Sequence, residues 1–188
     1  MKAYVDYAAA AGYRHIILAG HSLGVNKVIY YLAKTQDPRV QKFILLSPAN
    51  IAHLISVVTP EQKAIIADYL AHGRGQELLP FELLGWLPCV ADTADQWLHS
   101  LILDNVHLED DKDFSQIEQI SHTGALLIGT FDRFTYGDPS QFLRTINRHF
   151  PKHQQNELIF IENTGHTYQR KEQEVADRLL ALIQHWRA

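Results

Sequence analysis

A serine flanked by two glycines offers the clearest chemistry in the sequence. Residues 20–24 read Gly-His-Ser-Leu-Gly, so Ser22 has Gly20 two positions before it and Gly24 two positions after it. A turn sharp enough to hold a serine clear of the surface leaves no room for side chains at those two positions. A serine presented in this way can act as the nucleophile of an acyl-transfer enzyme. The backbone N–H of Leu23 would then lie beside the hydroxyl and could stabilise an oxyanion.

Two further residues could complete a catalytic triad with this serine. Asp132 follows the apolar run 125–128, and His166 lies on a glycine-containing loop after the apolar run 158–161. Of the eleven histidines, His166 alone completes the order Ser, Asp, His after three successive predicted strands. The histidine would take the proton of the serine, and the carboxylate would fix the tautomer of the histidine. Asp138 is the alternative acid, although the proline after it is more typical of a helix cap.

Two other sets of reactive side chains fit catalysis or metal binding less well. The single cysteine, Cys89, follows a proline in an apolar stretch and has no matching histidine motif, so we do not expect a thiolate nucleophile. A crowded set of histidine and acidic side chains consists of His107, Glu109, Asp110, Asp111 and Asp113. Their spacing matches no metal-binding motif and is more typical of a solvated loop, so the sequence predicts no metal site.

The elements that must position these residues follow from the pattern of apolar residues. Short apolar runs that end at turn residues predict buried strands at 15–19, 43–46, 125–128 and 158–161. Helical spacing and helix-ending signals predict helices at 2–11, 23–34, 139–150 and 169–186. Because strands that alternate with helices form a parallel sheet with helices on both faces, the predicted fold class is α/β.

Residues 51–124 do not follow this alternation. Three of the seven prolines of the chain lie in this stretch, and helical patterns cover 61–70, 76–84 and 92–103. We therefore predict a helical insertion at 51–124, placed over the strand ends of a core that is formed by 1–50 and 125–188.

Composition limits the classes of partner. The 188 residues are 46% hydrophobic and 20% charged, which suits one folded domain with a small insertion. The net charge is −4 and no Lys/Arg run is dense, so nucleic acid and anionic membranes are not expected partners. No apolar run approaches the roughly 20 residues that a membrane-spanning helix needs. One cysteine excludes an intramolecular disulfide, and we expect a cytoplasmic protein.

The segments around the predicted triad resemble the α/β-hydrolase superfamily, in particular its serine esterase, lipase-like and acyl-peptidase-like branches. The resemblance is carried by G-Y-R-H-I-I-L-A-G-H-S-L-G at 12–24, by F-I-L-L-S-P-A at 43–49, and by the loops that hold the acid and the histidine. It implies Ser22 as nucleophile, Asp132 as acid and His166 as base of an enzyme that needs no cofactor. It also implies a small or medium ester as substrate, and a lid or cap role for the insertion.

The same resemblance identifies the turn around the serine as a nucleophile elbow. Its members are Gly20, His21 and Gly24, with the N–H of Leu23 as an oxyanion donor. The superfamily usually has about four strands before the nucleophile strand, whereas about fifteen residues precede that strand here. The loop that normally supplies the second oxyanion N–H follows one of those strands. Loss of one such donor typically costs about 10²–10³ in rate.

The predicted strand at 15–19 would for the same reason lie at a free edge of the sheet. Such an edge exposes unpaired backbone groups, so we expect a second copy or another chain to cover it. Three functions stay open from the sequence. They are a serine hydrolase, a binding or scaffold protein that keeps the triad without turnover, and a non-hydrolytic enzyme on the same fold.

Overall fold

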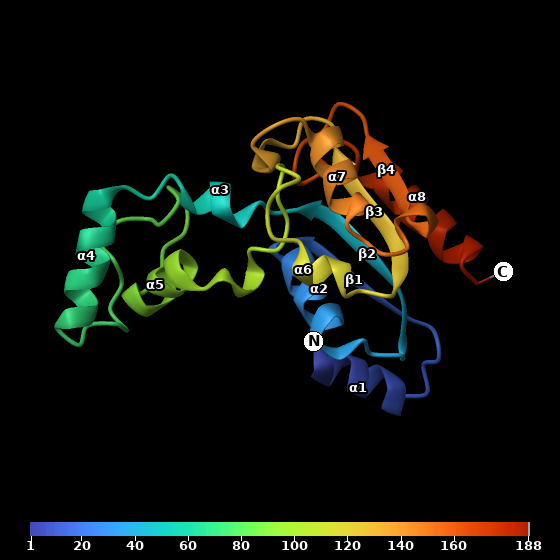
Figure 1. Ribbon diagram of the computed structural model, residues 1–188, viewed down its shortest axis with the longest axis horizontal. Coiled ribbons are helices and arrows are strands. Elements are labelled where there is room, and N and C mark those ends of the chain that lie inside the picture. Colours follow the sequence, from blue (N-terminus) through green and yellow to red (C-terminus); the bar gives the residue numbers. More distant parts are fainter. Residues whose placement is uncertain (188) are drawn as a thin grey trace. The chain divides into compact units, whose positions relative to one another are not determined.

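The computed structural model describes residues 1–187 of the chain (Figure 1). The chain forms two compact units. The first, here called the core unit, consists of Met1–Asn50 and the chain from Asn105 onward. The second, here called the helical unit, consists of Ile51–Asp104.

The core unit contains a four-stranded sheet in which all neighbouring strands are parallel. Its strands are β1 Ile16–Ser22, β2 Val40–Pro48, β3 Thr123–Gly129 and β4 Glu157–Ile161. The strands lie in the order β1-β2-β3-β4, which confirms the predicted parallel sheet (Figure 1). Among the described residues, β1 pairs with β2 alone, so β1 forms one edge of the sheet.

Side chains that alternate along the strands build two apolar layers. Leu45 and Ile128 point into the larger layer, with side chains of α2 and α7. Leu127 and Ile161 point to the opposite face, where Val175 of α8 covers them. The helices of this unit are α1 Lys2–Ala10, α2 Leu23–Thr35, α6 Ser115–Glu118, α7 Pro139–Arg148 and α8 Glu172–His185. Helices therefore cover both faces, as the sequence predicts, and no helix within residues 1–187 is long and apolar enough to cross a membrane.

Helix α2 is fixed to the sheet by one apolar face. Val25, Val28, Ile29 and Leu32 recur at helical spacing, and each is at most 1% exposed. Full burial of such a side chain contributes roughly 1.5–3 kcal/mol. The helix ends where Gln36 takes a left-handed conformation, just before an Asp-Pro pair that cannot continue it. This packing holds the first turn of α2 directly behind β1.

The helical unit is smaller than the predicted insertion. Residues 105–124 belong to the core unit because Phe114, Ile117 and Ile120 are buried in its main apolar layer. The boundary predicted at 124 is therefore wrong, and the unit ends at Asp104. Its helices are α3 Ile51–Ile55, α4 Pro60–Ala71 and α5 Ala91–His99. The N–H of Ala52 donates to the carboxylate of Asp104 at 3.2 Å, which ties the start of the unit to its end.

The helix predicted at 76–84 is absent. This stretch forms turns and two isolated antiparallel bridges, Leu78 with Val90 and Leu83 with Leu87. The chain reverses just beyond Leu83, where the next two residues have φ values of 61° and 78°. Helical φ values are negative, so no helix can pass through this reversal.

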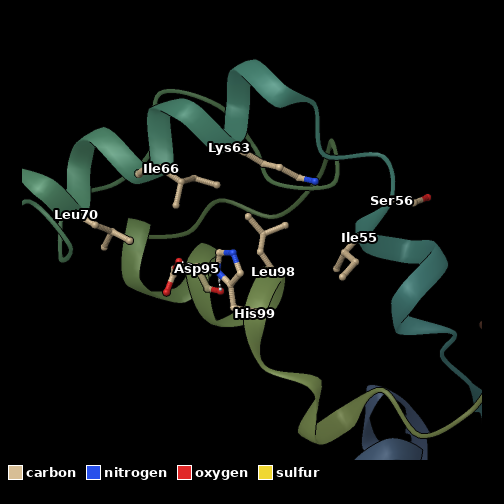
Figure 2. A pocket seen from close by; sticks show the side chains of 9 residues that line it. Ile55, Ser56, Lys63, Ile66, Leu70, Asp95, Leu98 and His99 are labelled. Atoms are coloured by element: carbon tan, nitrogen blue, oxygen red, sulfur yellow. Dashed lines mark hydrogen bonds and ion pairs between the residues drawn. The ribbon is translucent and has the colours of Figure 1, made fainter. Parts of the chain in front are cut away.

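A groove of about 550 Å³ lies within the helical unit, between α4 and α5 (Figure 2). Its apolar lining includes Ile66 and Leu70 from α4 and Leu98 from α5. Beside them on α5, His99 Nδ1 lies 2.8 Å from the carboxylate of Asp95. The groove thus combines apolar lining residues with the polar pair Asp95 and His99.

Candidate active site

Ser22 lies at the sharp junction of β1 and α2. It has φ 55°, a region that non-glycine residues rarely adopt and that is often found at functional sites. A Cβ atom on Gly20 would lie 2.5 Å from the carbonyl carbon and oxygen of Gly24, so any side chain there would clash. A Cβ atom on Gly24 would meet nothing within 4 Å. The predicted steric requirement for glycine is therefore confirmed at Gly20 and wrong at Gly24. The close approach is between position 20 and the backbone of Gly24, so a side chain at position 24 would not clash.

The structure brings Ser22, His166 and Asp132 into one hydrogen-bonded chain. His166 Nε2 lies 2.8 Å from Ser22 Oγ, and His166 Nδ1 lies 2.9 Å and 3.1 Å from the two carboxylate oxygens of Asp132. The Asp132 side chain is fully buried, and that of His166 is 12% exposed. With the proton on Nδ1 donated to the carboxylate, Nε2 is free to accept the proton of the serine hydroxyl.

The loop after β3 fixes the carboxylate of Asp132. One oxygen also accepts the backbone N–H of Phe134 at 2.9 Å, which caps the short 3₁₀ turn Arg133–Thr135. The alternative acid, Asp138, lies outside this arrangement. It is exposed and caps α7 by accepting the backbone N–H of Gln141 at 2.6 Å.

The loop after β4 presents His166 because it packs tightly on the loop after β3. A Cβ atom on Gly129 would lie 2.5 Å from the carbonyl oxygen of Thr164, so only glycine permits this approach. The N–H of Phe131 donates to the same Thr164 carbonyl at 2.9 Å. The ring of Phe134 also lies against the ring of His166, with centroids 4.3 Å apart.

Two side chains that the sequence did not identify as supports also hold this loop. Tyr168 is 6% exposed, and its hydroxyl donates to the Leu127 carbonyl at 3.1 Å and accepts from Ser47 Oγ at 2.8 Å. Burial raises the pKa of the Tyr168 hydroxyl well above its usual range, so it stays a neutral donor. His21 Nε2 donates to the backbone carbonyl of His166 at 2.8 Å, and the two rings lie 5.0 Å apart. In the sequence, the one feature that points to Tyr168 is its position two residues after His166, the candidate base.

Leu23, the predicted oxyanion donor, directly follows Ser22 at the start of α2. It is the first residue of α2, so its N–H has no carbonyl partner within the helix. The positive end of the helix dipole reinforces this donor toward a developing negative charge.

The remaining reactive groups lie elsewhere. Cys89 is buried in the helical unit, and burial raises the pKa of its thiol, which disfavours a thiolate. Asp110 pairs with Arg148 at 3.0 Å, and Asp113 accepts the N–H of Ser115 at 2.8 Å. In the part of the chain from 1 to 187, no group of His, Cys, Asp or Glu side chains is arranged to hold a metal ion.

Solved structures match nearly the whole length of the chain. A monoacylglycerol lipase from Paleococcus ferrophilus has a TM-score of 0.57 and 18% identity, covering 97% of this chain and 73% of the lipase. A hydrolase from Pseudomonas aeruginosa PA01 has a TM-score of 0.55 and 16% identity. The match covers 97% of this chain and 69% of that hydrolase. An α/β-hydrolase enzyme from a lagoon-sediment metagenome of Mar Chica, Morocco, has a TM-score of 0.52 and 17% identity. The match covers 99% of this chain and 68% of that enzyme.

No protein-family model matches the sequence, and no curated protein matches it significantly. At identities of 16–18%, the likeness to the solved structures concerns the fold. The chain therefore has the α/β-hydrolase fold, over a length that corresponds to 68–73% of these three structures.

Proposed function

We propose that the protein is a serine hydrolase that cleaves carboxylic esters with Ser22 as nucleophile. The fold alone does not determine the reaction. The observation that carries the proposal is the hydrogen-bonded chain from Ser22 through His166 to the buried carboxylate of Asp132, with spacings of 2.8 Å and 2.9 Å. This order and these spacings support a role for the three residues as nucleophile, base and orienting acid in acyl transfer.

In the first half-reaction, Ser22 Oγ forms a bond to the ester carbonyl carbon while His166 Nε2 takes the hydroxyl proton. The carbonyl oxygen becomes an oxyanion, toward which the N–H of Leu23 donates. The bond from the carbonyl carbon to the alcohol oxygen then breaks, and His166 returns its proton to that oxygen. Asp132 holds Nδ1 protonated throughout and stabilises the imidazolium.

In the second half-reaction, water attacks the acyl group on Ser22 and gives one proton to His166. The bond to Ser22 Oγ breaks, the carboxylic acid leaves, and the proton returns to the serine. Every step uses groups of the chain and water, so the proposal includes no cofactor.

The proposal extends to the surroundings of the site. The helical unit Ile51–Asp104 would serve as the cap that selects small or medium esters. A strand from a second copy or another chain would pair with the free edge of β1, which light scattering would detect as a species larger than one chain. The single buried cysteine fits a reducing compartment, hence a cytoplasmic location.

A fluorophosphonate probe and p-nitrophenyl acetate test the central claim. The probe should label the wild type, and Ser22→Ala should abolish both labelling and hydrolysis. Ser100→Ala, which changes an exposed serine of the helical unit, should keep both. If the wild type is neither labelled nor active, or if Ser22→Ala behaves like the wild type, the hydrolase proposal fails. The alternative of a binding or scaffold protein would then gain support.

A further inference from the structure

A crevice of about 230 Å³ lies between the loops that carry Asp132 and His166. His166 itself lines the crevice, together with Phe131, Arg133 and Phe134 from the loop after β3. A group bound in the crevice would therefore lie beside the base of the proposed mechanism. This inference rests on the proposed hydrolase function.

Arg133 brings to the crevice a guanidinium that forms no ion pair among the described residues. It is the one residue of the lining with a permanent charge. Within residues 1–187 its guanidinium forms no hydrogen bond or ion pair, whereas Arg39, Arg74 and Arg148 each pair with a carboxylate at 2.6–3.0 Å. The adjacent carboxylate of Asp132 is already occupied by the histidine ring and a backbone N–H.

The mechanism decides which part of an ester faces the crevice. The carbonyl group must lie at Ser22 and the N–H of Leu23, while the departing alcohol oxygen must lie within reach of the His166 proton. The crevice is lined by His166 and not by Ser22 or Leu23, so an ester that extends from Ser22 into the crevice would do so with its alcohol portion. Phe131, which is 63% exposed, and Phe134 offer ring surfaces there for an apolar or aromatic alcohol.

We propose that this crevice binds the alcohol portion of the substrate and that Arg133 pairs with a carboxylate on it. The preferred substrates are then esters of hydroxy acids, in which the hydroxyl is acylated and the carboxylate is free. A planar guanidinium suits a carboxylate through two parallel hydrogen bonds. The small volume fits a single ring or short chain with its carboxylate.

Two matched substrates isolate the charge. They are 3-acetoxybenzoate and 3-acetoxybenzamide, which are nearly equal in size and differ in charge at the group that would meet Arg133. We expect the ratio of kcat/KM for the acid to kcat/KM for the amide to fall about 3- to 10-fold in Arg133→Gln, as for a charged hydrogen bond of an exposed side chain. Comparing ratios between variants cancels the intrinsic reactivity of the two esters.

Two variants complete the comparison. Arg133→Lys keeps the charge without the two-pronged geometry and should give an intermediate ratio. Arg178→Gln removes an exposed arginine of α8 that does not line the crevice, and it should keep the wild-type ratio. Raising NaCl from about 0.05 M to about 0.5 M should lower the ratio in the wild type and not in Arg133→Gln.

An unchanged ratio in Arg133→Gln, or a wild-type ratio that does not respond to salt, overturns the inference. The proposed function survives that result if both esters are hydrolysed by the wild type and not by Ser22→Ala. If neither ester is hydrolysed and the fluorophosphonate probe does not label Ser22, the proposed function fails and this inference fails with it.

Discussion

Replacing Tyr168 with phenylalanine should show how much its hydrogen bonds, which hold the loop of His166, contribute to stability and rate. The substitution leaves Ser22, His166 and Asp132 unchanged. The change removes one oxygen atom, and with it the hydrogen bonds to the Leu127 carbonyl and from Ser47 Oγ. Each such bond contributes about 1 kcal/mol, and Ser47 is left buried with fewer partners. We expect Tyr168→Phe to lower the free energy of unfolding by about 2 kcal/mol, which corresponds to a fall in Tm of about 4–8 °C.

The same substitution should also lower kcat. Tyr168 lies two residues after His166 in the loop that places Nε2 at 2.8 Å from Ser22 Oγ. Displacement of a catalytic group by about 1 Å can cost about 10²-fold in rate, so we expect a loss of roughly 10- to 100-fold in kcat with a smaller change in KM.

Tyr31→Phe is the matched control for this experiment. Tyr31 is also buried, at 8% exposure, and its hydroxyl donates to Asp37 at 2.6 Å, away from the triad. It should lose a similar amount of stability and keep its kcat. Ester hydrolysis and thermal unfolding of both variants make the comparison. If the two variants lose the same fraction of kcat, the loop-support argument for Tyr168 is refuted.

Asp132→Asn should lower kcat on the order of 10⁴-fold in an ester assay, because an amide no longer holds the histidine in the required tautomer. An effect below about 10-fold would exclude Asp132 as the acid. Gly20→Ala should abolish fluorophosphonate labelling through its 2.5 Å clash, whereas Gly24→Ala, with open space at its Cβ, should be labelled. Hydrogen bonds from Arg39 hold the pKa of Asp37 well below its usual range, so the stability they provide is present above about pH 4 and is lost as the pH falls toward the folded-state pKa. Urea unfolding between about pH 2 and pH 6 should therefore depend less on pH in Asp37→Asn, and an unchanged slope would contradict this.

The fold could be predicted where local sequence and long-range packing agree. Buried parallel strands are apolar along their whole length, so β2 and β3 are recognisable from short runs alone. The chain order then places Asp132 and His166 at the carboxyl ends of neighbouring strands. That order predicts that the two side chains lie near Ser22 at one edge of the sheet, but not the hydrogen bonds that hold their loops.

The errors arise where structure depends on distant contacts. Phe114 and Ile117 show no long periodic pattern, yet both are buried in the core unit, and so the sequence predicts the end of the insertion about twenty residues too late. A leucine rarely adopts the left-handed conformation, so the sequence does not predict it at Leu84. Because of this conformation, the chain reverses where the sequence predicts a helix. Tyr168 and His21 bind backbone carbonyls 41 and 145 positions away, which no local pattern encodes.

The hydrogen bond that joins the two ends of the helical unit has a consequence for how such proteins diversify. Because Ala52 and Asp104 meet at 3.2 Å, the chain leaves the core unit and returns to it through neighbouring points. A segment with adjacent ends can be exchanged, lengthened or shortened without altering the register of the strands that it separates. The helical unit and the strands of the core unit can therefore change in sequence and length independently of each other.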